Sequence, residues 1–216
     1  MSFLQDNKNI GLLLLILGIM SIIAPLALFM YKFSTAYVIV MVIGGIISGL
    51  VFILAGLSVR DSKDDPLGLL QLFAGIMGLK ISYDIKIGIP ALLILVFGIT
   101  FIFQGIFAIV AGAVNHAIGV SLGTAIIFII VGIFFLISAP IVAGNKKSSA
   151  GNVIWIILLI MIILGLLVAI LTAIGGFFWP IYGLCMLIYG ICLLLLIIFL
   201  LLAILSPEIK KNMGVD

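Results

Sequence analysis

The charged residues of this chain are confined to a few short gaps. Between Gly11 and Leu205, every stretch long enough to cross a bilayer contains no Lys, Arg, Asp or Glu. A crossing helix needs about 20 consecutive apolar residues. The hydrophobic fraction of the chain is 66%, well above the roughly 45–50% that is usual in soluble domains. The sequence therefore indicates a polytopic membrane protein whose surface is largely solvated by lipid.

The apolar runs between the charged gaps predict an all-α fold, a single integral membrane domain formed by a bundle of six transmembrane helices. Within residues 66–87, the apolar run Leu67–Leu79 holds thirteen residues. As a helix it measures about 20 Å, which is shorter than the roughly 30 Å hydrocarbon core. We therefore expect residues 66–87 to form a re-entrant or interfacial segment. The six predicted spans cover residues 10–31, 36–59, 88–113, 117–143, 153–174 and 178–205.

The distribution of basic residues favours six spans over seven. With six spans, nine of the ten Lys and Arg residues fall on one side of the membrane and only Lys32 falls on the other. A seventh span at residues 67–80 would divide them seven against three. Because basic loops stay in the cytoplasm, we expect a plasma-membrane protein with a cytoplasmic N-terminus and C-terminus.

Small residues or prolines recur at intervals of seven on most spans. Such a repeat places them on one stripe of each helix and suits left-handed crossings near +20°. Lipid tails are as apolar as Leu, so helices in a membrane associate through close backbone approach, which small residues permit. We expect these stripes to be packing surfaces. They comprise Gly11, Gly18 and Pro25; Gly49 and Gly56; Gly98, Gly105 and Gly112; Ala125, Gly132 and Ala139; and Gly183 and Gly190.

Gln104 is the most deeply placed strong hydrogen-bonding side chain, near the middle of the third span. An unsatisfied amide in hydrocarbon is costly, so Gln104 is expected to face another helix or a wet cavity. Thr100 lies one helical turn earlier and would share that face. The two residues are candidates for a transport path, although an interhelical polar contact is the commoner role of a single Gln.

The last span repeats the pattern Tyr182-Gly183-Leu184-Cys185 as Tyr189-Gly190-Ile191-Cys192. Tyr and Cys at these spacings share one stripe, which suits either a ligand groove or a packing seam whose phenols bond to a neighbouring helix. Two cysteines without further ligands make a poor metal site, and seven residues of helix separate them too far for a disulfide. The packing seam is the preferred interpretation.

His116 is the only histidine and lies in a short turn predicted to face outwards. A solvated turn residue is its ordinary role. The alternative is an external pH sensor, because an unperturbed histidine pKa near 6.5 would let it become charged in mild acid.

The chain carries no phosphate-binding loop, dinucleotide fingerprint or catalytic triad pattern, and it places no Asp, Glu, Lys or Arg deep within a span. We therefore expect no enzymatic activity, no cofactor and no metal site. The scattered basic residues argue against a nucleic-acid partner. The lipid bilayer is the expected partner, with residues 60–86 as the place where a homo-oligomer or a membrane-complex partner would bind.

Two segments carry a family resemblance. Residues 17–25, Leu-Gly-Ile-Met-Ser-Ile-Ile-Ala-Pro, are echoed by residues 131–140, Val-Gly-Ile-Phe-Phe-Leu-Ile-Ser-Ala-Pro. This pattern resembles the Gly-Ile-to-Pro helix of the HdeD-like acid-resistance short membrane proteins. The glycine spacings at Gly98 and Gly105 and at Gly183 and Gly190 are similar to that family's second helix. The resemblance implies a small envelope protein without known catalytic residues, involved in stress tolerance.

Together these features predict a non-enzymatic structural, assembly or stress-tolerance component of the cell envelope. A small channel or facilitator is the first alternative, with Gln104, Thr100, Tyr182 and Tyr189 along its path. An accessory subunit of a larger membrane complex is the second, and its contacts would lie in residues 60–86.

Overall fold

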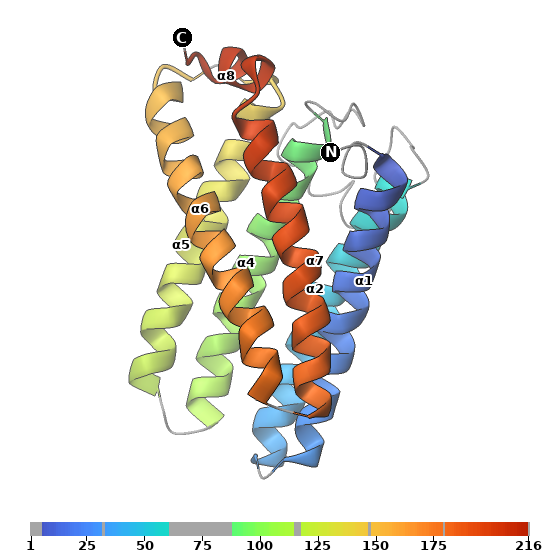
Figure 1. The fold of residues 1–216 in the computed structure, drawn as a ribbon. Coiled ribbons are helices and arrows are strands. Elements are labelled where there is room, and N and C mark those ends of the chain that lie inside the picture. Colours follow the sequence, from blue (N-terminus) through green and yellow to red (C-terminus); the bar gives the residue numbers. More distant parts are fainter. Residues whose placement is uncertain are drawn as a thin grey trace.

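The computed structural model describes residues 6–31, 33–60, 88–114, 118–146, 148–178 and 180–215, with the side chains of 118–121 left out. Within these ranges the chain is helical and contains no strand (Figure 1). The α-helices are α1 (Asn7–Ala27), α2 (Thr35–Arg60), α4 (Gly88–Val114), α5 (Ile118–Val142), α6 (Gly151–Gly175), α7 (Ile181–Ile204) and α8 (Pro207–Met213), with short 3-10 turns at η2 (Leu28–Met30) and η3 (Gly176–Phe178).

Six of these helices are long and apolar enough to cross a membrane, and only α8 is too short. The chain is therefore a multi-pass membrane protein, as the charge-free runs predicted. Each long helix begins and ends within a few residues of the predicted span. The expected re-entrant or interfacial segment at 66–87 lies outside the described residues.

The six long helices form three antiparallel hairpins, in which α1 packs on α2, α4 on α5, and α6 on α7. Helix α2 also packs on α4, which joins the first hairpin to the second. Helix α7 packs on α1, which joins the third hairpin to the first. By contrast, α5 and α6 meet only briefly. The order around the bundle is thus α5, α4, α2, α1, α7 and α6.

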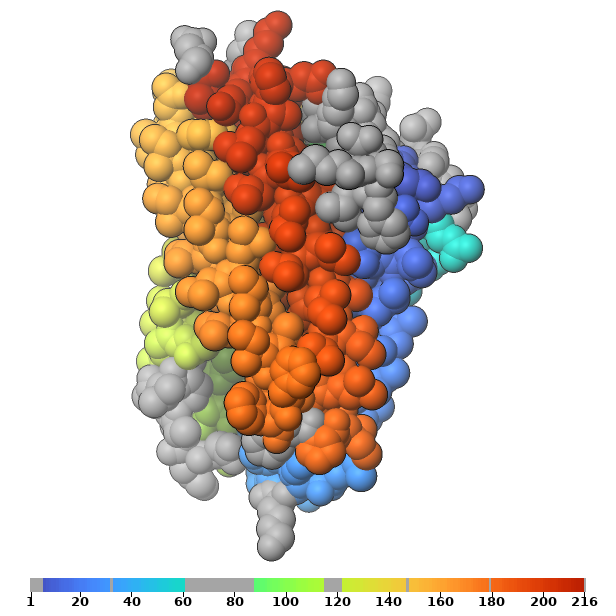
Figure 2. Space-filling view, in the orientation of Figure 1, coloured from blue at the N-terminus to red at the C-terminus, as the bar shows by residue number. Residues whose placement is uncertain are grey.

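The first half of α4 forms the centre of the core. All thirteen residues from Gly88 to Thr100 are buried, so this part of the helix is covered on every face. Its Phe97 ring meets the ring of Phe52 on α2 edge-on, with the centroids 6.0 Å apart. Helix α6 lies at the other extreme, on the surface beside α7 (Figure 2). Its exposed side is made of bulky Ile, Leu and Val residues, the composition expected of a surface facing lipid.

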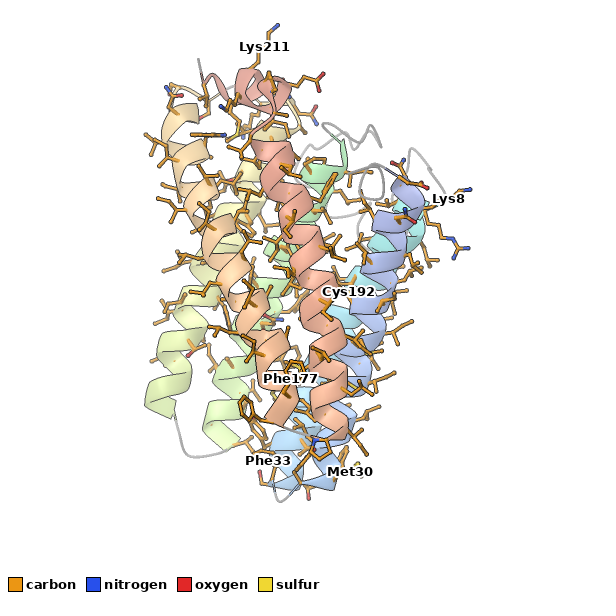
Figure 3. The ribbon with its side chains drawn as sticks, viewed as in Figure 1. Lys8, Met30, Phe33, Phe177, Cys192 and Lys211 are labelled. Carbon is orange, nitrogen blue, oxygen red and sulfur yellow. The ribbon has the colours of Figure 1, made fainter. Side chains whose placement is uncertain are left out.

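The two ends of the bundle differ in character. The first residues of α1, the last residues of α2 and α5, and the whole of α8 lie at one end, here called the α8 end (Figure 1). Figure 3 shows Lys8 and Lys211 at the α8 end, and Met30, Phe33 and Phe177 at the opposite end. The charged residues that the structure describes all belong to the α8 end: Asp6, Lys8, Arg60, Lys146, Glu208, Lys210 and Lys211. The opposite turns carry exposed Phe29, Met30, Phe33, Phe177 and Phe178.

Candidate functional site

The small-residue stripes of α1 and α2 face each other in register. A Cβ added at Gly11 would lie 2.7 Å from the carbonyl oxygen of Gly56, and a Cβ at Gly56 would lie 2.7 Å from the carbonyl oxygen of Gly11. Gly18 and Gly49 repeat this reciprocal relationship one heptad along, at 2.6 Å in both directions. Real Cβ atoms do not approach other atoms so closely. The two backbones are in contact, and only glycine fits at these four positions without a shift.

The hairpin of α4 and α5 is built in the same way. A Cβ at Gly132 would lie 2.7 Å from the carbonyl oxygen of Gly98, and a Cβ at Gly105 would lie 2.9 Å from that of Ala125. In the third hairpin, a Cβ at Gly190 would lie 2.6 Å from the backbone nitrogen of Ala173. The prediction that these stripes are packing surfaces is confirmed at these positions.

The structure places Thr100 and Gln104 on the side of α4 that is turned toward α2. Phe97 meets α2 through Phe52, and Phe107 lies against Gly44 of α2. Gln104 is seven residues after Phe97 and three before Phe107, so it shares this face of the helix. Gln104 is half-buried. Thr100 is 3% exposed, and its hydroxyl donates a hydrogen bond of 2.8 Å to the carbonyl oxygen of Val96 in its own helix.

The tyrosine stripe of α7 is turned toward the hairpin of α1 and α2. The hydroxyl of Tyr189 is hydrogen-bonded to the side chain of Ser21 on α1. Tyr182 lies near Tyr37, in the first turn of α2. The Tyr189 bond is the phenol contact to a neighbouring helix that a packing seam requires. Cys185 and Cys192 are buried and free.

The four candidate path residues therefore reach the hairpin of α1 and α2 from two different helices. Thr100 and Gln104 come from α4 and are turned toward α2, whereas Tyr189 and Tyr182 come from α7. Because α4 and α7 have little contact with each other, the two pairs approach the hairpin from separate sides.

Two expectations fall on residues that the structure does not describe. His116, the candidate pH sensor, lies outside the described ranges, and so does the expected partner-binding segment apart from its first residue, Arg60. Within the ranges that are described, no group of three His, Cys, Asp or Glu residues is placed to hold a metal ion.

The sequence reasoning missed α8, which packs across one end of the bundle. Ile209 and Met213 on α8 are buried, at 0% and 1% exposure. The sequence contains both a helix start signal and a helix stop signal for α8. Ser206 caps the first turn by accepting a hydrogen bond from the backbone N–H of Ile209, ahead of Pro207 at the first helical position. Gly214 ends the helix in the left-handed conformation with φ of 71°, the usual glycine stop.

Three side chains connect neighbouring helices at the α8 end of the bundle. The indole Nε1–H of Trp155 on α6 donates a 3.1 Å hydrogen bond to the carbonyl oxygen of Ile204 at the end of α7. The ammonium group of Lys210 lies 5.2 Å from the centroid of the same indole ring. The amide Nδ2 of Asn212 donates a 3.3 Å hydrogen bond to the carbonyl oxygen of Val142, the last residue of α5. Helix α8 thereby joins α5 and α6, which otherwise have little contact.

The fold belongs to the class of multi-pass α-helical membrane proteins. In this chain, backbone contacts between small residues hold the helix hairpins together. Comparison with models of known families, with curated proteins and with solved structures found no match to this chain.

Proposed function

We propose that this protein is a non-enzymatic component of the plasma membrane with a structural, assembly or stress-tolerance role. The observation that carries the proposal is the solid centre of the bundle: the first half of α4, from Gly88 to Thr100, is buried on every face. A helical segment that is covered on all sides serves as a packing axis. A continuous water-filled path along the same axis would leave one of its faces accessible.

The polar side chains described within the spans support the same proposal, because many of them already have hydrogen-bond partners within the bundle. The hydroxyls of Thr100, Ser138 and Thr172 donate to carbonyl oxygens one turn earlier in their own helices. Tyr189 bonds across to Ser21. Hydroxyls whose protons are already donated in this way are poorly available to a passing solute.

The stress-tolerance form of the role rests on the resemblance to HdeD-like proteins at residues 17–25 and 131–140. It is tested by deleting the gene and measuring survival of the cells after an acid shock. Reduced survival, restored by the intact gene, supports this form of the proposal. Unchanged survival would exclude the stress-tolerance form of the proposal, and a structural or assembly role would remain.

The first alternative, a small channel or facilitator, rests on Gln104, an amide that lies half-buried in the middle of a span. Purified protein in proteoliposomes is assayed for flux of protons and small solutes. Gln104→Leu is the test variant, and Thr172→Val is the control because it changes a hydroxyl bonded within its own helix. Flux that is lost only in Gln104→Leu would replace the structural proposal, whereas absence of flux in the unmodified protein supports it.

The second alternative is an accessory subunit that binds its partner through residues 60–86. Native mass spectrometry of protein extracted gently from its own membrane tests it directly. A foreign protein that co-purifies, and is lost when residues 60–86 are substituted, would establish this role. A bare monomer or a symmetric oligomer favours a protein that acts without other subunits.

A further inference from the structure

Two basic segments that are far apart in the sequence are brought together at the α8 end. The first is the turn between α5 and α6, which carries Lys146; the second is α8, which carries Lys210 and Lys211. The Asn212 hydrogen bond to Val142 holds α8 against the end of α5. A Cβ added at Gly144 in the turn would lie 3.1 Å from the side chain of Asn212.

The position of both segments is fixed by backbone packing as well. The turn is tied to α5 by hydrogen bonds from the backbone nitrogens of Asn145 and Lys146 to the carbonyl oxygen of Pro140, at 3.0 and 3.2 Å. At the start of α6, Gly151 lies directly against the carbonyl group of Met213. The like charges are therefore held at the same end by contacts that do not involve the charges themselves.

The balance of charge here is positive. Among the described residues of the turn and α8, Lys146, Lys210 and Lys211 are basic and Glu208 alone is acidic. Lys146 and Lys211 are exposed, and Lys210 is half-buried beside the Trp155 ring. Holding like charges together is unfavourable in the absence of a neutralising group. An anionic group that binds between the two segments would relieve this repulsion.

The depth of the site indicates which anion is available. Trp155 lies in the second turn of α6, near the end of a span, and tryptophan favours the level of the lipid headgroups. Lys210 is stacked on this ring, which places its ammonium group at the same level. The abundant anions at this depth are the phosphates of acidic phospholipids, which juxtamembrane lysines attract.

We propose that the turn between α5 and α6, together with α8, forms a binding surface for the headgroup of an anionic phospholipid. Lys146, Lys210 and Lys211 contact the phosphate region, while Ile209 and Met213 anchor α8 in the bundle. This inference does not depend on the role proposed above, because a structural protein and a facilitator would each use such a surface to fix their position in the membrane.

The experiment compares lipid binding by purified protein in detergent, titrated with phosphatidylglycerol or with phosphatidylcholine and followed by native mass spectrometry. The test variant is Lys146→Gln/Lys210→Gln/Lys211→Gln. The matched control is Lys8→Gln/Arg60→Gln, which removes two exposed cations of the same end from α1 and α2. A charge-preserving variant, Lys146→Arg/Lys210→Arg/Lys211→Arg, separates loss of charge from damage to the fold.

We expect the unmodified protein to prefer phosphatidylglycerol and the test variant to lose roughly fivefold in affinity for each lysine removed. The control and arginine variants should keep the preference. An equal loss per removed charge in the test and control variants would overturn the proposal, because it would show only the general charge of this end. Absence of any preference would also overturn it, as would displacement of the lipid by millimolar inorganic phosphate, which would identify a site for free phosphate. Retention of an acidic protein in place of lipid would overturn it as well.

Discussion

Gly18 and Gly49 are in backbone contact across the first hairpin. The backbone of each residue occupies the space that a side chain on the other would need. A Cβ on either residue would lie 2.6 Å from the carbonyl oxygen of its partner. In lipid there is no hydrophobic driving force between apolar helices. The close approach of the two backbones therefore selects the pairing of α1 with α2.

Gly18→Ala is therefore expected to destabilise the protein by about 1–3 kcal/mol, because the added methyl group forces the two helices apart. The measurement is the shift in thermal or denaturant-induced unfolding in detergent. Gly123→Ala is the control, since nothing lies within 4 Å of a Cβ at that position on α5. Equal effects of the two substitutions would show that helix propensity, and not the contact with Gly49, decides the outcome.

The hydrogen bond between Tyr189 and Ser21 is expected to couple α7 to α1. In a double-mutant cycle with Tyr189→Phe and Ser21→Ala, we expect a coupling free energy of about 0.6 kcal/mol, the average for interhelical hydrogen bonds in membranes. Thr172→Val in combination with Tyr189→Phe is the control cycle, because the Thr172 hydroxyl bonds within α6. Additive effects of Tyr189→Phe and Ser21→Ala would mean that the two side chains do not depend on each other.

Trp155→Phe keeps an aromatic ring but removes the donor to the carbonyl oxygen of Ile204, and it weakens the stacking of Lys210. We expect a loss of about 1 kcal/mol in the local stability of this end, visible as faster amide hydrogen exchange in residues 208–213. Asn152→Ala, an exposed neighbour in the first turn of α6, should leave the exchange unchanged. Unchanged exchange in Trp155→Phe would show that α8 is held without Trp155, by buried Ile209 and Met213 and by the Asn212 bond to Val142.

Single cysteines placed at the two ends test the direction of the chain in the membrane. Lys8→Cys and Lys211→Cys are at the α8 end, and Phe177→Cys is at the other. The native Cys185 and Cys192 are buried, and replacing both by Ala removes their background. In intact cells, an impermeant maleimide is expected to label only Phe177→Cys, because the basic end is expected in the cytoplasm.

The result would contradict the fold if Lys8→Cys and Lys211→Cys were labelled from different sides. Labelling of both in intact cells, without labelling of Phe177→Cys, would keep the fold and reverse the expected orientation.

Several features of the fold were readable from the sequence because they depend on local composition. The spans follow from runs of apolar residues without charge, and the ends of α2 at Arg60 and of α7 near Pro207 fall where charge or proline interrupts the run. Glycines at intervals of seven indicated which side of each helix would be packed. The candidate residues Thr100 and Tyr189 were also identified in the sequence, although their hydrogen-bond partners, Val96 and Ser21, were not.

The sequence by itself determined the six apolar spans found among the described residues, because the transfer of a helix into lipid is a sum over its own residues. Only the tertiary structure decided that Gly18 meets Gly49, that Gly98 meets Gly132, and that Asn212 binds Val142 across seventy residues of chain. Partner choice between apolar helices depends on the fit of their surfaces and on hydrogen bonds between distant segments. Neither is recorded in the composition of a single span, and the position of the turn that carries Lys146 beside α8 follows from the same distant contacts.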